Sequence, residues 1–494
     1  MQRWKHYRIS HPFRSDQQLR TISASSFNGK PIQFKPIRWS GTQIIDTFQQ
    51  VCIWDKSAAK LTSYNLKSCC LTLSLRETKR LELSVDEIQD FWNRGETQRI
   101  AEYLTYDLED TQLLADFLLP VVYYQLSIVP NIRFQDLAVA SPALKAQKIH
   151  QGLIPDIKPQ PDRALEYQGA LIHCSNPGLH CQVAKIDISS LYPSIMLRFG
   201  ICSQKDPQHQ FLGVMQYMTQ ERLKLKQLAK AGNIQAGHEQ NALKILLNGS
   251  YGFLGTKGYS FNDYQAAALV TAYGRKILIL MENIVTTSGG AVIELDTDGI
   301  IFSHPEPQKI TEAVQQALPD QINVELEFSD CGIYIPKAKS YVIVHPDSKT
   351  TIKGLFRKRD RYPLEKEFPV TFIKRYFLES AESAERYYQQ IRDAIATRQI
   401  SIEQLTVTRK IRAAETRIVN QGLGKPGEIV SFYYVEQKRS HAKSKKPLSS
   451  VALEATTGNY WVEWYLTKLE RQYQEITGTL PKSIAGEQLT LLNS

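Results

Sequence analysis

Acidic side chains follow two apolar segments of this chain. Asp187 comes directly after the β-branched segment 182–186, and Asp296 and Asp298 lie in the short Asp-Thr-Asp turn after segment 291–295. Sites that transfer nucleotides hold two Mg²⁺ ions, which clamp the attacking and leaving oxygens, and Mg²⁺ prefers a few carboxylates together with substrate oxygens and water. Each carboxylate alone is typical of an ordinary turn or helix cap. Together they indicate a two-metal site, provided that the two segments lie side by side.

Basic and amide side chains lie between those acidic segments. Segments 215–232 and 238–253 have the apolar periodicity of two helices. Two pairs of residues there are four positions apart and therefore share one helix face: Arg222 with Lys226, and Lys244 with Asn248. An arginine forks onto phosphate oxygens and a lysine acts as a point charge. The two helix faces together predict a binding site for a triphosphate. Arg222 and Lys226 taken alone would more simply indicate a solvated basic helix.

Periodicity also predicts the elements that must hold these groups. Segment 182–187 indicates a strand that ends on a carboxylate, and segments 291–295 and 299–302 indicate a hairpin around the Asp-Thr-Asp turn. A strand next to that hairpin would bring Asp187 and Asp298 together. Asp296 would share a face with Asp298 only if the strand stayed regular through the turn.

Helices are expected towards both ends of the chain. Ser84, with a glutamate three residues later, carries a capping signature, so that segment 84–125 is predicted to be helical. Helices also dominate after Pro369, interrupted at 422–446 by a stretch rich in Gly, Lys and Arg that we expect to be mobile. Residues 1–45 are polar and weakly patterned.

Composition narrows the class of protein. The 494 residues are too many for one core and suggest about three domains. Lys and Arg (60) outnumber Asp and Glu (50), and the net charge of +10 mildly favours a polyanionic partner. No apolar run is long enough to span a bilayer, and seven cysteines without a CxxC pair indicate reduced thiols rather than a zinc module. We therefore expect no membrane partner and a cytoplasmic, nucleoid-associated protein.

At these residues the chain resembles the family B DNA polymerases. Segment 187–194 is similar to the first palm motif of that family, Asp-x-x-Ser-Leu-Tyr-Pro-Ser, and segment 244–252 to its fingers motif, with Gly249 in place of the usual Ser. The Asp-Thr-Asp turn is similar to the third motif, although Gly299 stands where Ser is commoner and Leu295 where Gly often precedes. Further matches follow in the order of the family, which argues against a chance likeness.

The resemblance implies a right-hand polymerase of the α+β class. Its parts would be a palm built on an antiparallel sheet, helical fingers and a mainly helical thumb, preceded by a truncated exonuclease-like region of the RNase H type. The boundaries that the motifs imply are 1–125 for the truncated region, 126–204 for a linker and the first palm part, 205–254 for the fingers, 255–369 for the second palm part and 370–494 for the thumb.

The resemblance also implies roles for single residues. Asp187, Ile188 and Asp298 would hold two Mg²⁺ ions, with Mn²⁺ as a substitute, and Asp296 would support them closely. The nucleotide-binding set would be Ser189, Ser190 and Leu191 through their backbone, Tyr192 under the sugar where it excludes a 2′-hydroxyl, and Arg222, Lys226, Lys244, Asn248 and Tyr251. The set that contacts DNA would be Tyr167, Gly169, Gly252, Lys339, Tyr341, Lys353 and Gly354.

The exonuclease that usually precedes the palm is expected to be incomplete. Segments 60–67 and 106–110 are similar to its later parts, the second being its Tyr-x-x-x-Asp motif, but its Asp-x-Glu and Asn-x-x-x-Phe/Tyr-Asp segments are not found. Editing hydrolysis also uses two metal ions and needs several carboxylates to hold them. Asp110 alone cannot hold both ions, so we expect no proofreading by this chain. A partial sheet would have an unpaired edge, which a second polypeptide of a split enzyme or residues 1–45 would cover. A degenerate exonuclease and a misplaced start codon are the alternatives to a split enzyme.

The resulting hypothesis is a template-directed DNA polymerase that extends the primer strand of primer-template DNA with dNTPs. The short fingers segment argues against priming by a protein, because protein-primed members carry an insertion there. A basic cluster within 437–446 would contact duplex phosphates nonspecifically, unless it is a solvated loop. The rival hypothesis is a catalytically silent nucleic-acid-binding remnant or scaffold subunit. A decayed enzyme should have lost Asp187, Lys244 or Asp298, and all three are present. A nuclease is a weaker third option, because its carboxylates are not found.

Overall fold

Two compact units make up the chain in a computed structural model. The structure describes residues 14–15, 20–27, 30–34, 37–39, 42–58, 60–61, 63–76, 80–159, 166–357, 361–411, 419–420, 422–425, 429–438 and 450–478. Unit 1 comprises Met1–Gly169 and Ser190–Tyr273, and unit 2 comprises Ala170–Ser189 and Gly274–Ser494. One of the passages between the units, from Ser189 to Ser190, therefore lies inside the first acidic motif.

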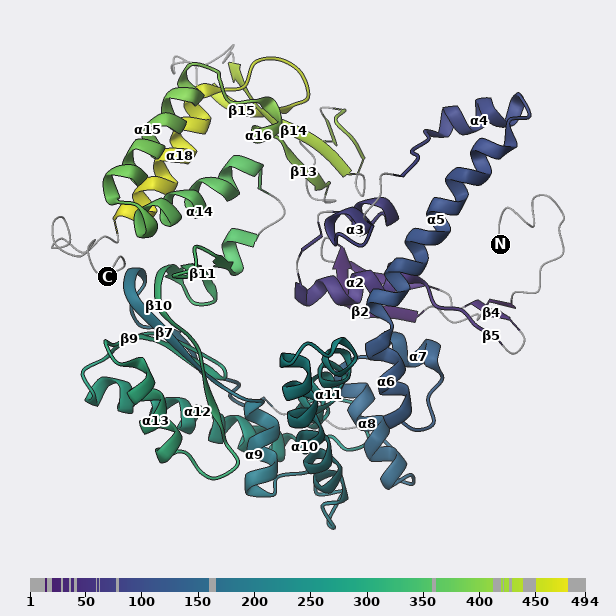
Figure 1. The fold of residues 1–494 in the computed structure, drawn as a ribbon, viewed down its shortest axis with the longest axis vertical. Coiled ribbons are helices and arrows are strands. Elements are labelled where there is room, and N and C mark those ends of the chain that lie inside the picture. Colours follow the sequence, from purple (N-terminus) through teal and green to yellow (C-terminus); the bar gives the residue numbers. More distant parts are fainter. Residues whose placement is uncertain are drawn as a thin grey trace, which may run out of the picture. The chain divides into compact units, whose positions relative to one another are not determined.

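Unit 1 is built mainly of helices (Figure 1). They are α2 (Thr47–Ala58), α3 (Leu66–Thr72), α4 (Val85–Asn93), α5 (Thr97–Leu118), α6 (Pro120–Ile128), α7 (Phe134–Val139), α8 (Pro142–Leu153), α9 (Leu191–Phe199), α10 (Gln210–Lys230) and α11 (Ile234–Leu254). Helix α12 (Tyr264–Thr287) begins in unit 1 and ends in unit 2. The predicted cap of α4 is confirmed, since the side chain of Ser84 accepts the N–H of Glu87 while the Glu87 carboxylate accepts the N–H of Ser84 at 2.7 Å.

Short strands precede these helices. They are β1 (Arg14–Ser15), β2 (Arg20–Phe27), β3 (Lys30–Phe34), β4 (Ile37–Trp39) and β5 (Thr42–Gln43). β2 pairs antiparallel with β3, and β1, β4 and β5 form a second sheet in the order β1-β4-β5. The sequence of residues 1–45 is polar and weakly patterned, and no strands were predicted there. Pieces of two to eight residues offer too few alternating positions for their period to stand out in a polar sequence.

The two helices expected at the centre of the chain are confirmed as α10 and α11. They are joined at Gly232, which has a φ of 95°, and the side chain of Asn233 caps α11 by accepting the N–H of Ala236 at 2.9 Å. A short turn of this kind makes consecutive helices antiparallel neighbours. Arg222 and Lys244, which are similarly far from the turn, therefore lie at about the same level of the hairpin.

A buried histidine ties the centre of unit 1 together. The ring of His150 on α8 is fully buried and stacks on Phe211 and Phe261, with ring centroids 4.5 and 3.6 Å away. Its Nε2 lies 3.0 Å from Oδ2 of Asp206, whose carboxylate also accepts the first backbone N–H groups of α10. Burial, opposed by Asp206, lowers the pKa of His150 from 6.5 to about 4. His150 is therefore neutral in the folded chain at pH 7.

We expect His150 to make unit 1 sensitive to mild acid. The unfolded chain binds a proton at this site below pH 6.5 and the folded chain only near pH 4, so stability falls as the pH drops between those values. Between pH 7.5 and 5 this single group should remove about 2 kcal/mol from the free energy of unfolding. Urea unfolding at both pH values, read by hydrogen exchange in α8, measures the loss. The variant His150→Gln, which can still donate to Asp206, should lose about 2 kcal/mol less; equal losses in both proteins would contradict the assignment.

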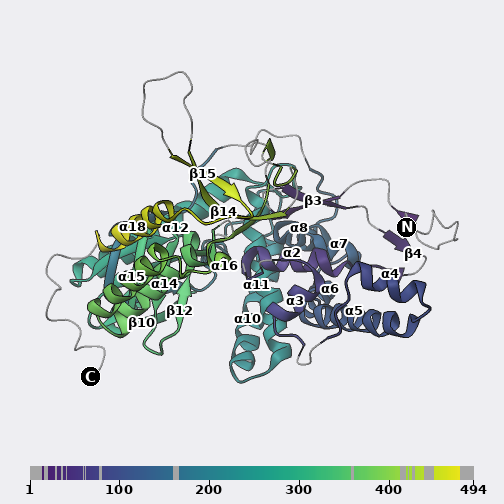
Figure 2. The ribbon, with the colours of Figure 1, turned by 90° about the horizontal axis from the view of Figure 1, so that it is seen from above.

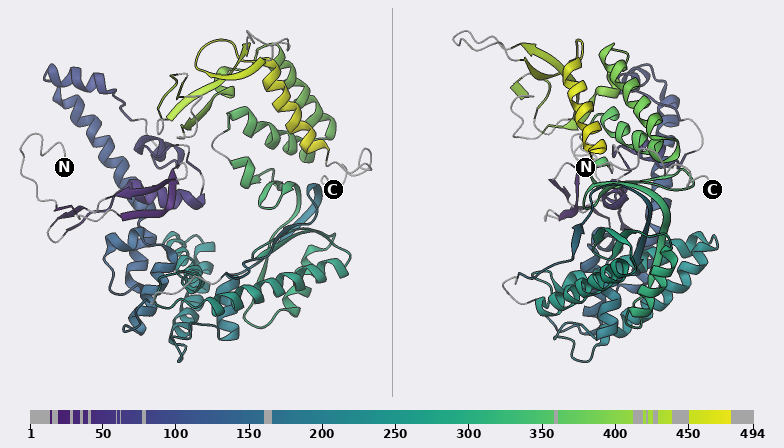
Figure 3. Two further views of the ribbon diagram at one scale, coloured as in Figure 1. Left: turned by 180° about the vertical axis from the view of Figure 1, so that it is seen from behind. Right: turned by 90° about the vertical axis from the view of Figure 1, so that its left-hand side faces the viewer.

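An antiparallel sheet is the centre of unit 2. Its strands are β6 (Ile172–Cys174), β7 (Gly178–Ile188), β8 (Ala291–Asp296), β9 (Gly299–Ser303), β10 (Val324–Lys337), β11 (Ser340–Val344) and β12 (Thr350–Ile352). They lie in the order β12-β11-β10-β7-β9-β8-β6 and curl as they pass from one to the next (Figures 1 and 3). Helix α13 (Pro307–Ala317) packs on β10, and the 3-10 helix η1 (Gly354–Arg357) follows β12. The predicted strand at 182–187 and the predicted hairpin are both confirmed.

Strand β7 lies inside that sheet, between β9 and β10. A strand buried on both faces reads as a nearly continuous apolar run, and Val183, Ala184 and Ile186 are fully buried as this requires. Lys185 breaks the run and yet is only 9% exposed. A lysine in such a place needs partners for its charge.

The remainder of unit 2 combines helices with a second sheet. Its elements are α14 (Pro363–Leu378), α15 (Ala381–Ala396), α16 (Ile402–Leu405), β13 (Val407–Lys410), β14 (Ile429–Lys438), β15 (Ser450–Ala455) and α18 (Val462–Thr477). Helices α14, α15 and α18 pack side by side around an aromatic core (Figure 2). Helix α14 begins before Pro369, which lies inside it.

Strand β14 corrects, for residues 429–438, the expectation of a mobile stretch at 422–446. It pairs with β13 and β15, and Phe432 and Tyr433 are buried. The run Val430 to Val435 is β-branched and aromatic, which favours a strand, but the Gly and Lys residues around it obscured that signal. Most of the basic cluster within 437–446 lies outside the described residues. In the part of the chain that is described, no helix is both long and apolar enough to cross a bilayer.

Candidate active site

The three aspartates of the acidic motifs lie at the same end of neighbouring strands in unit 2. Asp187 on β7 pairs directly with Gly299 on β9, and Asp296 pairs with the same glycine across the hairpin. The backbone N–H of Ile188 donates to the carbonyl oxygen of Asp298 at 2.7 Å. The sequence predicted that Asp187 and Asp298 would be neighbours only if their two segments lay side by side. The pairing of β7 with β9 meets this condition.

The turn that carries Asp298 is tight and strained. Thr297 has a φ of 52°, in the left-handed region that β-branched residues rarely adopt. The N–H of Asp298 donates to the carbonyl of Asp296. Backbone strain of this kind is commonly kept near functional side chains, and here it lies between Asp296 and Asp298.

Burial and a neighbouring negative charge perturb one carboxylate of this acidic site. The pKa of Asp298 is raised to about 6, first by burial and then by the negative charge of Asp187. Among the described residues, no three acidic, His or Cys side chains gather closely enough to enclose an ion by themselves. Mg²⁺ does not need such a cage, because it is usually held by one or two carboxylates and completed by water and substrate phosphate. Asp187 and Asp298 fit that donor set.

Sequence reasoning missed three charged residues beside these carboxylates. Lys185 lies 3.0 Å from Oδ1 of Asp187 and also bonds Glu327 on β10. Burial alone would lower the pKa of Lys185, but these two carboxylates outweigh it and raise the pKa, so the ammonium is charged. Glu294 on β8 is fully buried, and its Oε1 accepts the N–H of Lys339 at 2.5 Å. The available signal for two of them was a charged residue inside an apolar strand, two positions before a motif aspartate: Lys185 before Asp187 and Glu294 before Asp296.

Gly299 leaves room for this arrangement. A Cβ at that position would lie 2.8 Å from the carbonyl oxygen of Ile186, 3.0 Å from Oδ1 of Asp187 and 3.3 Å from Cε of Lys185. Any larger residue would press on the β7 backbone and on the carboxylate. The departure of Gly299 from the commoner Ser thus has a structural reason in this chain.

Four of the residues expected to contact DNA, Lys339, Tyr341, Lys353 and Gly354, lie in or next to β11, β12 and η1 of unit 2. Nζ of Lys339 lies 2.7 Å from Oδ1 of Asp296. Lys353 lies over the ring of Tyr341, 5.3 Å from its centroid, and Gly354 has a φ of 65° with the Lys339 carbonyl where a Cβ would be. Tyr341 is only 2% exposed. Its ring supports Lys353 from within the core, and the expected contact of Tyr341 with DNA stays a prediction.

Unit 1 holds the groups expected to bind the triphosphate. Helix α9 begins after Ser190, which is left-handed (φ 54°), and no side chain caps it. A helix start of this kind favours an anion. Nη1 of Arg222 on α10 donates to Oγ of Ser190 at 3.1 Å, which adds a guanidinium to that end. The backbone N–H of Ser189, in contrast, donates to the carbonyl of Asn323 at 2.9 Å within unit 2, so this N–H is not available to a phosphate here.

Tyrosines lie next to the start of α9. The ring of Tyr192 lies against that of Tyr251 on α11, with centroids 4.5 Å apart, and the hydroxyl of Tyr251 lies 3.1 Å from that of Tyr167. Tyr251 therefore contacts both Tyr192, which like Tyr251 was expected to bind the nucleotide, and Tyr167, which was expected to bind DNA. Gly169 follows in the same segment, where the carbonyl of Gln168 accepts from Thr271 at 2.8 Å.

Helix α11 presents two further expected residues to solvent. Lys244 and Asn248 are exposed, whereas Arg222 and Lys226 on α10 are half-buried. The opposite side of α11 packs closely on α8. A Cβ at Gly249 would lie 2.2 Å from the carbonyl oxygen of Pro142, and one at Gly252 would lie 3.1 Å from Cβ of Ala143. The close approach at Gly252 is thus to α8, and Gly249 replaces the usual Ser because α8 leaves no room for one.

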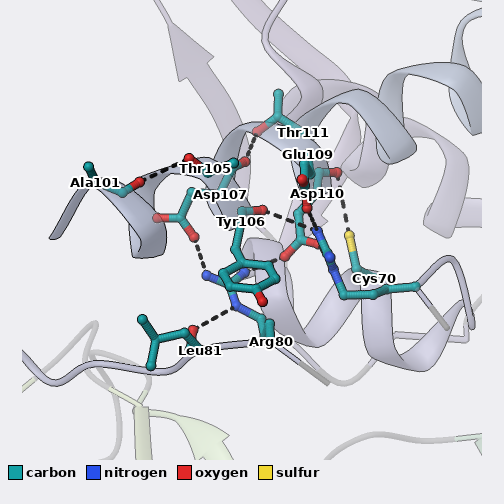
Figure 4. A network of polar contacts seen from close by, with 11 residues as sticks. Cys70, Arg80, Leu81, Ala101, Thr105, Tyr106, Asp107, Glu109, Asp110 and Thr111 are labelled. Carbon is teal, nitrogen blue, oxygen red and sulfur yellow. Dashed lines mark hydrogen bonds and ion pairs between the residues drawn. The ribbon is translucent and has the colours of Figure 1, made fainter. Parts of the chain in front are cut away.

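The aspartate of the exonuclease-like motif is fully engaged by arginines. Asp110 on α5 is completely buried; its Oδ1 lies 2.6 Å from Nε of Arg76, and Arg80 bonds its Oδ2. Arg80 also bonds Asp107, and Arg76 bonds Glu109 at 3.0 Å (Figure 4). The ring of Tyr106 lies 5.1 Å below the guanidinium of Arg76. Both oxygens of Asp110 are therefore bonded to guanidinium groups and not directed at an open site.

Comparison with known proteins decides the family. Residues 215–478, more than half of the chain, match the model of the DNA polymerase family B. The chain belongs to DNA polymerase family B. Among curated relatives of this family B chain, a DNA polymerase of Archaeoglobus fulgidus is 26% identical over 56% of the chain and 40% of the relative. A DNA polymerase of Thermococcus sp. is 23% identical over 77% of the chain and 57% of the relative.

Solved structures agree on the fold. The family B DNA polymerase of Pyrobaculum calidifontis aligns with 90% of this family B chain and 65% of its own length, at a TM-score of 0.62 and 18% identity. The α+β fold with its curled antiparallel sheet is thereby confirmed. The chain spans less than two thirds of these relatives.

Proposed function

We propose that this chain is a template-directed DNA polymerase that adds deoxynucleotides to the 3′ end of a nucleic-acid primer. The observation that carries the proposal is the pairing of β7 with β9, which sets Asp187 beside Asp298. Membership of DNA polymerase family B supports it. We assign the palm to the β6–β12 sheet, the fingers to α10 and α11, and the thumb to the elements from α14 onward.

In this proposal Asp187, Ile188 and Asp298 hold two Mg²⁺ ions, which Mn²⁺ can replace. When bound, the ions neutralise phosphate charge and acidify the primer hydroxyl. Asp296 stays paired with Lys339 and fixes the turn that aims Asp298. Asp298 is half-buried beside the negative charge of Asp187, and a bound cation would balance both charges.

The triphosphate would be bound by groups of unit 1. Arg222 supplies a fork at the start of α9, and Lys226, Lys244 and Asn248 add charge and hydrogen bonds along the α10–α11 hairpin. The Leu191 and Tyr192 end of α9 favours the phosphates through its helix dipole. Lys339 and Lys353 would hold the DNA backbone. These contacts are electrostatic, so binding of primer-template DNA should weaken steeply with salt.

We also propose that the chain does not proofread by itself. Asp110, which matches the exonuclease motif, has both oxygens bonded to arginines, so it cannot serve as a metal ligand without breaking a buried network. The second polypeptide expected from the sequence stays a prediction. Co-purification of the chain from its native cells, followed by mass spectrometry of stoichiometric partners, tests it.

Tyr192 gives a prediction about sugar selection. Its ring is held by Tyr251, and removal of the ring should open space for a 2′-hydroxyl. We expect Tyr192→Ala to raise the incorporation of ribonucleotides relative to deoxynucleotides by about tenfold or more. Single-nucleotide incorporation with matched dNTP and rNTP measures the ratio. Tyr192→Phe, which keeps the ring, is the control; unchanged selection in the Ala variant would remove Tyr192 from this role.

A primer-extension assay tests the proposed function as a whole. A 5′-labelled primer on a longer template is incubated with the purified chain and Mg²⁺, with and without dNTPs. We expect template-directed lengthening with dNTPs and an intact 3′ end without them. No lengthening under any metal or salt condition would favour the silent remnant, and shortening without dNTPs would refute the absence of proofreading.

A further inference from the structure

One cation is built into the acidic cluster of unit 2. Lys185 and Asp187 lie two residues apart on β7 and therefore project from the same face of the strand. Nζ of Lys185 lies 3.0 Å from Oδ1 of Asp187, and the same ammonium bonds Oε2 of Glu327 on β10. Lys185 thus bridges the carboxylate that the proposed function assigns to a metal ion and a second carboxylate beside it.

The strands on both sides of β7 are shaped around this bridge. On one side the register of β10 shifts between Leu326 and Phe328, and Glu327 is the residue inside that shift. A register shift of this kind re-aims a side chain. On the other side Gly299 leaves the space that a Cβ would take from Asp187 and Lys185. The Lys185 side chain is only 11% exposed, so its stem is packed and its ammonium has little water to replace these partners.

We propose that Lys185 is a positioning residue that acts as an internal counter-ion of Asp187. While no divalent ion is bound, the ammonium holds the Asp187 carboxylate in place and balances its charge. A divalent ion that takes Oδ1 of Asp187 as a ligand has to displace Lys185 from that oxygen. The inference rests on the proposed function, because it takes Asp187 as the residue that holds the ion.

This competition has a consequence for the order of binding. An ion that arrives alone must replace an ammonium that already satisfies two carboxylates. An ion that arrives with a triphosphate brings additional oxygen ligands. Lys185 therefore favours loading of the ion together with the nucleotide over loading of the ion alone.

The direct test is binding of Mn²⁺ to the full chain without DNA or nucleotide, measured by calorimetry. Lys185→Met keeps most of the packed stem and removes the charge, so it should bind Mn²⁺ at least about fivefold more tightly than the unmodified chain. Lys185→Arg should bind like the unmodified chain. Lys309→Met removes an exposed lysine paired with Glu306 and should change nothing. Equal or weaker binding by Lys185→Met would overturn the proposal.

A measurement on the unmodified chain covers the case in which Lys185→Met does not fold. Acetylation of lysines by an amine reagent, read by peptide mass spectrometry, should become severalfold faster at Lys185 when saturating Mn²⁺ frees its ammonium. The rate at Lys309 should stay constant. An unchanged or slower rate at Lys185 would overturn the proposal. Neither measurement depends on nucleotide transfer. A chain that extends primers without showing these effects would therefore refute this inference and leave the proposed function standing.

Discussion

Replacement of Asp187 by Asn should lower the rate of primer extension by about a thousandfold or more. The substitution keeps the size of the side chain but removes the charge that would hold a divalent ion. Such an ion supplies several kcal/mol of charge stabilisation, and each 1.4 kcal/mol is a factor of ten in rate. Single-turnover incorporation of one dNTP measures the effect.

The same variant should still bind duplex DNA within a few-fold of the unmodified chain. Phosphate contacts from basic side chains dominate that binding, and Asp187 is not one of them. Asp347→Asn is a matched control, because Asp347 lies on the same sheet, in the β11–β12 hairpin, paired with Lys349 at 2.6 Å. We expect it to extend primers normally. Normal extension by Asp187→Asn, or loss of DNA binding equal to the loss of extension, would contradict the assignment.

Replacement of Asp110 by Asn should cost about 3–5 kcal/mol of folding free energy, because it leaves two nearly buried guanidinium groups without their shared anion. Urea unfolding, followed by hydrogen exchange in α5, measures the loss. If Asp110 instead served as an editing metal ligand, the variant would be at least as stable as the unmodified chain. In that case Mg²⁺ would also protect α5 from exchange.

Glu109→Gln is the control for that experiment. Glu109 pairs with Arg76 at 3.0 Å, but its side chain is 53% exposed, and exposed pairs contribute about 0–1 kcal/mol. The two variants remove one negative charge each from neighbouring positions of α5. A similar loss in both would show that net charge, and not the buried network around Asp110, determines the stability of this region.

The central hairpin could be predicted because its signal is local. Short apolar runs on both sides of the Asp-Thr-Asp turn indicate a hairpin, and a strand ending at Asp187 needed only to pair with it. The hairpin of α10 and α11 was equally local, since Gly232 and Asn233 mark its turn. These elements carry half of the expected site residues.

What the sequence could not supply depends on register and on close packing. The bond between Lys185 and Glu327 requires a register shift in β10, which no pattern in the sequence announces. The burial of Tyr341 and the contact of Gly249 with α8 depend on which element packs on the far side. The arginines around Asp110 lie 30 and 34 positions away from it in the chain, so their pairing was not a local signal either.

The most direct test of the account is the position of the divalent ions. A crystal of the chain with primer-template DNA and a non-hydrolysable dNTP, soaked in Mn²⁺, would locate them by anomalous scattering. We predict two peaks, with a carboxylate oxygen of Asp187 and one of Asp298 at about 2.0–2.2 Å, the distance usual for small divalent ions. Peaks elsewhere, or bound nucleotide with no ion at either aspartate, would contradict it.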